Sequence, residues 1–114
     1  MAVGEVVIER DQGVWVLTLL GEHDVSTEPG LGEALRQAFG SGSKVVVDFS
    51  EVEFIDSSVL RALAEGQKEA VEHAEHQMVI VAPRGAFAAR VLSLTGIDKV
   101  IRVYQTRADA LVAI

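Results

Sequence analysis

The chain contains no cysteine, which excludes a disulfide framework, thiol catalysis and a cysteine-ligated metal. It also has no apolar run approaching about 18 residues, the length that a membrane-spanning helix needs. The first residues, Met1 to Glu5, carry no basic segment of the kind that opens a secretory leader. These absences, together with the compatibility of a cysteine-free chain with a reducing compartment, predict a soluble cytosolic protein.

Basic side chains are few and scattered. Ten lysine and arginine residues stand against 17 aspartate and glutamate residues, so the formal net charge is −7 at pH 7. A negative surface repels nucleic acid and anionic membranes, so we expect neither direct DNA or RNA binding nor membrane association. A basic protein partner fits this charge better.

Internal repeats, linkers and low-complexity segments are also lacking. Hydrophobic residues make up 49% of the 114 positions, which is enough to bury a core and excludes a disordered chain. The chain is too short for a second core. We therefore predict one domain spanning residues 1–114.

The N-terminal residues predict an antiparallel hairpin. Strand-like runs at 5–10 and 14–20 are joined by the turn triplet Asp11-Gln12-Gly13. The second run is almost entirely apolar, which is typical of a central strand. A loop is expected at 21–24, and Ser26 or Thr27 can cap the helix that follows, with Pro29 tolerated in its first turn.

Beyond the hairpin, strands and helices alternate. Strands are predicted at 44–49, 78–82 and 100–104. The first predicted helix ends at the glycine and serine residues of 40–43, and the second follows Asp56. The third spans 86–94 and stops at Gly96, and the fourth closes the chain after a Thr106–Asp109 capping box. The order ββαβαβαβα predicts an α/β domain with about four helices and a mixed, mostly parallel sheet of about five strands with right-handed crossovers.

The helix after Asp56 has an amphipathic pattern. The residues expected to face the core are Leu60, Leu63, Ala64, Gln67, Ala70, Val71 and Ala74. The residues expected to face outward are Arg61, Glu65, Lys68, Glu69 and Glu72.

The Asp56-Ser57-Ser58 step follows the third predicted strand by a six-residue loop and opens this helix. One interpretation is that Asp56 or Ser57 is an N-cap, which stabilises a helix by about 1 kcal/mol. The other is that Ser57 is phosphorylated, which adds about −1.5 to −2 charges beside the unpaired amides of the helix start. Because those amides and the helix dipole stabilise a phosphate, its effect would fall on a docked partner and leave the fold intact.

Four segments in register resemble one known family. They are Gly21-Glu22-His23-Asp24 before a capped helix, Val45-Val46-Val47-Asp48-Phe49-Ser50, Phe54-Ile55-Asp56-Ser57-Ser58, and Val91-Leu92-Ser93-Leu94-Thr95-Gly96-Ile97. Together they resemble the STAS domain, which is shared by sulfate transporters and bacterial anti-sigma factor antagonists, and the resemblance covers nearly the whole chain.

The resemblance implies a partner-switching protein. In the unmodified state it binds an anti-sigma factor of the serine-kinase type, and the sigma factor is displaced. The kinase uses ATP to phosphorylate the serine directly after the motif aspartate, here Ser57 with Ser58 as the fallback, and a serine phosphatase resets it. By the same resemblance, Asp24 and Asp56 shape the partner-binding surface, to which Ser57, Ser58 and Val59 also belong.

Val59 departs from the family pattern, which usually has glycine after the serine pair. A β-branched residue is stiff and adds bulk in the first helical turn, where a kinase approaches the backbone closely. Val59 therefore favours an alternative within the same fold, a constitutive scaffold or an accessory subunit of a transport complex, with the serines as helix caps.

The histidines do not predict a site. His73 and His76 could place two imidazoles on one face, but two histidines seldom hold a metal, and we predict an exposed helix end where they complement the dipole. His23 has no serine or cysteine nucleophile beside it in the sequence, so a triad is unsupported. The glycines show neither Walker nor dinucleotide spacing, so no cofactor and no enzymatic activity are expected.

A third hypothesis is a receiver-like domain with Asp48, at the end of the third strand, as phosphoacceptor. Such a domain needs an acidic pair after the first strand to hold Mg²⁺. Arg10-Asp11-Gln12 does not supply that pair.

Overall fold

The N-terminal hairpin forms as predicted. In a computed structural model, which describes residues 4–41, 44–73 and 75–114, β1 (Glu5–Asp11) pairs antiparallel with β2 (Val14–His23). The connecting residues Gln12 and Gly13 have φ of 54° and 81°, the left-handed pair that matches the twist of a tight hairpin. The predicted loop at 21–24 is wrong up to His23, because β2 stays paired with the next strand along its whole length.

The sheet has the strand order β1-β2-β3-β4-β5, with every pair after the hairpin parallel. The later strands are β3 (Lys44–Ile55), β4 (Gln77–Val81) and β5 (Val103–Tyr104). This confirms the α/β class, the mixed sheet and the element order. The fifth strand is shorter than predicted because residues 97–99 form a 3₁₀ turn, η1 (Ile97–Lys99), whose Ile97 carbonyl accepts hydrogen bonds from the amides of Val100 and Ile101.

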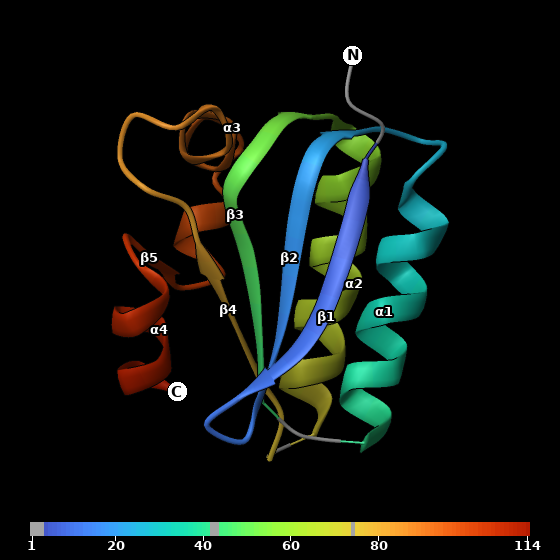
Figure 1. The fold of residues 1–114 in the computed structure, drawn as a ribbon, viewed down its shortest axis with the longest axis vertical. Coiled ribbons are helices and arrows are strands. Elements are labelled where there is room, and N and C mark those ends of the chain that lie inside the picture. Colours follow the sequence, from blue (N-terminus) through green and yellow to red (C-terminus); the bar gives the residue numbers. More distant parts are fainter. Residues whose placement is uncertain (1–3, 42–43, 74) are drawn as a thin grey trace.

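Helices cover both faces of the sheet (Figure 1). They are α1 (Glu28–Ser41), α2 (Ser57–Glu72), α3 (Phe87–Thr95) and α4 (Arg107–Ala113). On one face of the sheet, α1, α2 and α3 pack against strand residues such as Leu17 and Val47. On the other face, α4 packs against the alternate strand residues, such as Val16 and Val46. Among the described residues, none of these helices has the length and apolarity to cross a membrane.

The helix ends largely follow the predicted signals. Thr27, directly before α1, accepts the first helical hydrogen bonds with its carbonyl, and Gly96 ends α3 with φ of 79°. The Thr106 hydroxyl accepts a hydrogen bond from the Asp109 amide at 3.1 Å, which caps α4. The predicted end of α1 is confirmed as far as Ser41, and residues 42 and 43 lie outside the described part of the chain.

The buried face of α2 is rotated from the predicted one. Its buried residues are Ser58, Val59, Ala62, Leu63, Gly66 and Ala70. Val71 is 73% exposed and Ala64 is also exposed, so their predicted burial is wrong; Leu60 and Gln67 are half-buried, and Ala74 lies outside the described residues.

Side-chain size explains this rotation. Ala62, Gly66 and Ala70, four residues apart, form a strip of small residues that lets the α2 backbone approach α1 and β4. A Cβ atom on Gly66 would lie 3.0 Å from Met78 Sδ and 3.4 Å from Leu35 Cδ1. The closest packing therefore selects the small residues, whereas hydrophobicity alone points to Ala64 and Val71.

Arg107 ties α4 to the sheet. Its guanidinium donates to Glu9 at 3.0 Å, to the Thr18 hydroxyl at 3.0 Å and to Asp48 Oδ2 at 3.5 Å. Partial burial lowers the pKa of Arg107, but hydrogen bonds to Glu9 and Asp48 and the attraction of their negative charges raise it by more. The net result is a pKa above the usual value. Asp48 itself is buried, which makes Arg107 the counter-ion of a buried carboxylate.

Replacing Arg107 should destabilise the domain, because Asp48 would remain buried without its counter-ion. We expect Arg107→Met to lower the free energy of unfolding by about 1–3 kcal/mol in urea denaturation. The matched control is Arg36→Met, which breaks only an exposed pair with Glu33 and should cost less than about 1 kcal/mol. Equal effects of the two substitutions would contradict the counter-ion role.

Enlarging Gly66 should also destabilise the domain. We expect Gly66→Leu to lower the free energy of unfolding by about 1–3 kcal/mol through overpacking against Met78 and Leu35. Gly40→Leu is the control, because a Cβ on this α1 glycine meets no described atom within 4 Å and leucine is the better helix former. Thermal unfolding of both variants separates the packing effect from helix propensity, and a stable Gly66→Leu would contradict the close approach.

Candidate functional site

Two loops meet at the carboxyl edge of the parallel strands. The last residue of β2, His23, pairs with the last residue of β3, Ile55. The next residue on each strand is an aspartate, Asp24 and Asp56, so the register places both aspartates at the same edge. Figure 1 shows the start of α2 and, on the other side of β3, helix α3 at this edge as well.

The third strand reaches this edge through two irregularities. Thr18 pairs with Asp48 and Leu20 with Glu51, so β3 carries one extra residue there, and a second shift follows between Gly21 and Glu22. Asp48 Oδ1 accepts hydrogen bonds from the amide of Ser50, at 2.8 Å, and from its hydroxyl, which holds the first bulge. The predicted six-residue loop before the helix is therefore wrong, because residues 50–55 continue the strand.

Asp56 is the N-cap of α2. Its Oδ1 accepts hydrogen bonds from the Ser58 amide at 2.9 Å and from the Ser58 hydroxyl at 2.5 Å, and its backbone is extended. Of the two predicted caps, Asp56 is correct and Ser57 is wrong, because Ser57 is the first residue of the helix. Ser58 is 8% exposed, so its hydroxyl is both buried and engaged.

Ser57 differs from Ser58 in both respects. Its side chain is exposed, and its hydroxyl has no hydrogen-bond partner among the residues that the structure describes. It stands at the positive end of the α2 dipole, where added negative charge is stabilised. Of the two serines, Ser57 alone presents a free nucleophilic oxygen to solvent.

Val59 lies in the core. Its side chain is fully buried beneath the first turn of α2. The sequence-based expectation that its bulk obstructs a kinase at the surface is therefore wrong. Val59 supports the helix start from below, so its expected place in the partner-binding surface is also wrong. On the same turn, Ser57 is exposed.

The Asp24 loop repeats the geometry of the helix start. Asp24 Oδ1 accepts hydrogen bonds from the Ser26 amide at 2.8 Å and the Ser26 hydroxyl at 2.6 Å. These bonds, led by that to the hydroxyl, lower the pKa of the exposed Asp24 carboxyl. With Asp48 and Ser50, the described part of the chain has three Asp-X-Ser motifs in which one carboxylate oxygen accepts hydrogen bonds from both the amide and the hydroxyl of the serine.

His23 anchors the Asp24 loop from below. Its ring is fully buried, and Nε2 lies 3.2 Å from the Glu5 carbonyl and 3.1 Å from the Leu20 carbonyl. Since carbonyls only accept, Nε2 carries a proton, and Nδ1 lies 3.1 Å from the Thr27 hydroxyl. Both ring nitrogens are engaged, so His23 positions the loop.

Two phenylalanines at this edge were missed by sequence reasoning. Phe54 and Phe87 are 41% and 42% exposed, and their ring centroids are 5.8 Å apart. Phe54 escapes the core because the second irregularity of β3 shifts the alternation of faces. An exposed aromatic pair is typical of a surface that contacts another protein.

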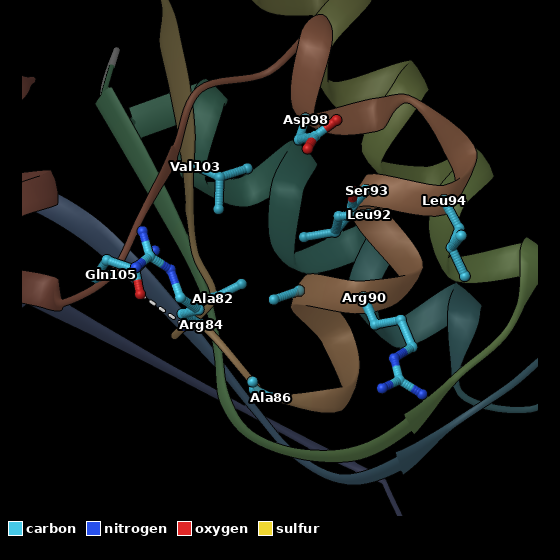
Figure 2. A pocket seen from close by; sticks show the side chains of 12 residues that line it. Ala82, Arg84, Ala86, Arg90, Leu92, Ser93, Leu94, Asp98, Val103 and Gln105 are labelled. Carbon is cyan, nitrogen blue, oxygen red and sulfur yellow. Dashed lines mark hydrogen bonds between the residues drawn. The ribbon is translucent and has the colours of Figure 1, made fainter.

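A cleft of about 610 Å³ lies on the other side of the edge, between α3, the end of β4 and β5. Figure 2 shows its two arginines, Arg84 and Arg90, extending in different directions. The Arg84 amide donates to Gln105 Oε1 at 2.6 Å, which joins the loops after β4 and β5. The cleft therefore does not converge two positive charges on one ligand.

Comparisons with known proteins agree with this geometry. The chain is 32% identical over 110 residues to the anti-sigma-F factor antagonist RsfB of Mycobacterium tuberculosis, covering 96% of this chain and 88% of RsfB. It is 34% identical, with a TM-score of 0.88, to the crystal structure of an anti-sigma factor antagonist from Mycobacterium paratuberculosis, covering 98% of this chain and 94% of that one.

More distant structures share the fold. The anti-sigma factor antagonist SpoIIAA in its unphosphorylated form is 17% identical with a TM-score of 0.75, covering 94% of this chain and 93% of that one. The phosphorylated form of SpoIIAA, a Bacillus cell fate determinant, is 18% identical with a TM-score of 0.64, covering 94% and 96%.

The family model for the STAS domain matches residues 5–110, from the first residue of β1 to the interior of α4. This match includes all four segments on which the sequence resemblance rests. The chain belongs to the STAS domain family.

Proposed function

We propose that this protein is a cytoplasmic anti-sigma factor antagonist that works as a non-enzymatic partner switch. Unmodified, it binds an anti-sigma factor of the serine-kinase type through the carboxyl edge, that is, Asp24, Phe54, Asp56, Ser57 and Phe87. The bound kinase phosphorylates Ser57 and thereby releases the antagonist, and a serine phosphatase restores the hydroxyl. The relatives from Mycobacterium, which are named as antagonists, support this assignment.

The observation that carries the proposal is the different state of the two serines. Ser58 is buried and its hydroxyl is bound to Asp56, whereas Ser57 is exposed and its hydroxyl is unbound within the described part of the chain. A kinase therefore reaches Ser57 without unfolding the helix start. Ser58, the fallback phosphoacceptor, could react only after losing its bond to Asp56.

The chemistry requires only a positioned hydroxyl from this chain. Ser57 Oγ attacks the γ-phosphorus of ATP, the new O–P bond forms as the bond to the ADP oxygen breaks, and the hydroxyl proton passes to a base on the kinase. The serine contributes position and exposure, and the kinase contributes the base and the metal-bound nucleotide. The Asp56 N-cap keeps the serine at a fixed place on the rigid first turn.

Electrostatics explain how the phosphate would release a partner. The edge already holds Asp24, whose low pKa keeps it charged, and Asp56. Phosphorylation adds about −1.5 to −2 charges beside them. A partner surface that fits the neutral Ser57 hydroxyl and the aromatic pair would have to strip water from the phosphate and would be repelled by its charge, so the complex would weaken. Within the fold, the amides at the start of α2 stabilise the phosphate.

The alternatives fit the site less well. The scaffold and transport-accessory hypothesis drew on Val59 as an obstruction, and the burial of Val59 removes that argument. A receiver would need Asp48 at an accessible strand end, but Asp48 is buried, bound to Arg107, and followed by seven further residues of β3. The sheet order also differs from the 2-1-3-4-5 order of receiver-type folds.

Phosphorylation should occur at one position. With ATP and the cognate anti-sigma factor kinase, intact-mass analysis is expected to show one added phosphate on the wild-type protein and on Ser58→Ala, and none on Ser57→Ala. Circular dichroism should show all three proteins folded, because the Asp56 bond to the backbone amide of residue 58 survives in Ser58→Ala. A phosphate on Ser57→Ala that is absent from Ser58→Ala would move the site to the fallback serine.

Charge at position 57 should weaken binding more than a change of shape. In calorimetric titrations, we expect Ser57→Asp to reduce affinity for the anti-sigma factor by at least about tenfold. Ser57→Asn, whose side chain has nearly the shape of aspartate without its charge, should reduce affinity by less than about threefold. Stability should change little, because an acidic residue in the first turn of α2 is favourable. Equal affinity of both variants and wild type would favour the scaffold.

A further inference from the structure

A cluster of two imidazoles and one carboxylate lies at the end of α2 remote from Ser57. Glu69 is on the last turns of the helix, His73 is its C-cap, and His76 lies in the turn that leads to β4. Glu69 Oε1 is 3.3 Å from His73 Nε2 and 3.8 Å from His76 Nδ1. One donor atom from each residue lies within 4.8 Å of the other two.

Local packing holds this cluster in place. The amide of His76 donates to the His73 carbonyl at 2.8 Å, and the centroids of the two rings lie 4.9 Å apart. The His76 ring stacks on Phe39 of α1, with centroids 5.1 Å apart and planes 25° from parallel. His76 is therefore anchored by a second helix, contrary to the prediction of a merely exposed helix end.

One donor atom lacks a partner. His76 Nδ1 is buried, and the described residues offer it no hydrogen bond, since Glu69 Oε1 is too far for one. A buried ring nitrogen without a partner loses the hydrogen bond that it would make with water. A metal ion between His76 and Glu69 would satisfy this atom.

We propose that Glu69, His73 and His76 bind one Zn²⁺ ion through Glu69 Oε1, His73 Nε2 and His76 Nδ1. Zinc binds imidazole nitrogen and carboxylate oxygen at about 2.0–2.2 Å, so donors around one tetrahedral ion lie about 3.3 Å apart. The 3.3 Å between Glu69 Oε1 and His73 Nε2 already equals this value, and the 3.8 Å between Glu69 Oε1 and His76 Nδ1 is close to it.

The donor set favours zinc over the hard cations. Mg²⁺ and Ca²⁺ require oxygen ligands, whereas imidazole suits first-row transition metals such as Zn²⁺. Three protein ligands leave the fourth position to water, and the side chains of His73 and Glu69, 55% and 42% exposed, leave that position accessible. The net charge of −7 also attracts a cation.

Glu69 was not predicted to join the two histidines, because it belongs to an earlier helical turn. The sequence pattern places Glu69 only among the residues of the helix that face outward. Helical geometry instead brings Glu69 beside His73 at a separation of four residues. Bound zinc would join the last turn of α2 to the turn before β4, so it would stabilise the native state without touching the carboxyl edge.

The test is a titration of the full chain with ZnCl₂, followed by ¹⁵N NMR of the histidine rings. We expect one equivalent of zinc to shift His73 Nε2 and His76 Nδ1, and to leave both nitrogens of the buried His23 unchanged as an internal reference. Glu69→Gln and His73→Gln should each weaken binding by at least about tenfold. Glu72→Gln, which alters an exposed carboxylate on the same turn outside the cluster, is the matched control and should bind as wild type.

Several results would overturn the site. These are no saturable shift below about 1 mM zinc, shifts at only one of the two clustered histidines, or equal losses in Glu69→Gln and Glu72→Gln. His76 is left intact in the variants because its ring packs on Phe39, and thermal unfolding without zinc confirms that each variant is folded. Zinc should raise the melting temperature of wild type and Glu72→Gln but not of His73→Gln.

Discussion

The parallel pairing of β2 with β3 is the constraint on which the rest of this structure depends. It runs from Trp15 and Val45 to His23 and Ile55, and it accommodates extra residues in β3 without losing the final pair. Because that final pair is kept, Asp24 and Asp56 leave the sheet side by side. The buried His23 ring below one loop and the Asp48 carboxylate at the bulge support the same edge from inside.

The Asp-X-Ser turn occurs at Asp24, Asp48 and Asp56 and determines which hydroxyl groups are hydrogen-bonded. In each Asp-X-Ser turn the carboxylate engages the amide and the hydroxyl of the serine two residues on. At the start of α2 the motif is followed by a helix, and the residue between Asp56 and Ser58 is itself a serine. The engaged Ser58 stabilises the turn, and the unengaged Ser57 is left to react. The proposed phosphoacceptor, Ser57, is therefore a different residue from the N-cap, Asp56.

Much of the fold follows from local patterns in the sequence. The Val45-Val46-Val47 run predicts a central strand, Gln12-Gly13 a tight turn, and Gly96 a helix end, because each depends on nearby residues alone. The extension of β3 to Ile55 could not be predicted in this way, since Glu51 and Glu53 resemble a loop until the pairing with β2 is known. The buried face of α2 was likewise decided by the proximity of Met78 and Leu35 to Gly66, which is a tertiary contact.

The residues of the candidate site likewise divide into those that the local sequence predicts and those that only tertiary contacts bring together. Asp56 and Ser57 could be selected from the sequence because a helix start has a local signature, and Asp24 came from the family resemblance. Phe54 and Phe87 come from β3 and α3, elements that meet only in the folded molecule, as do Phe39 and His76. The spacing of these residues in the sequence does not predict that their rings meet.

Under the proposed function, phosphorylation of Ser57 changes a surface and leaves the fold unaltered. Amide NMR spectra of the unmodified and phosphorylated proteins test this most directly. We expect shift changes confined to residues 24–27, 54–60 and 84–88, with an unchanged or slightly higher free energy of unfolding. Changes that spread to α4 and the β3–β4 core, or a loss of stability, would place the switch inside the fold and refute a switch confined to the surface.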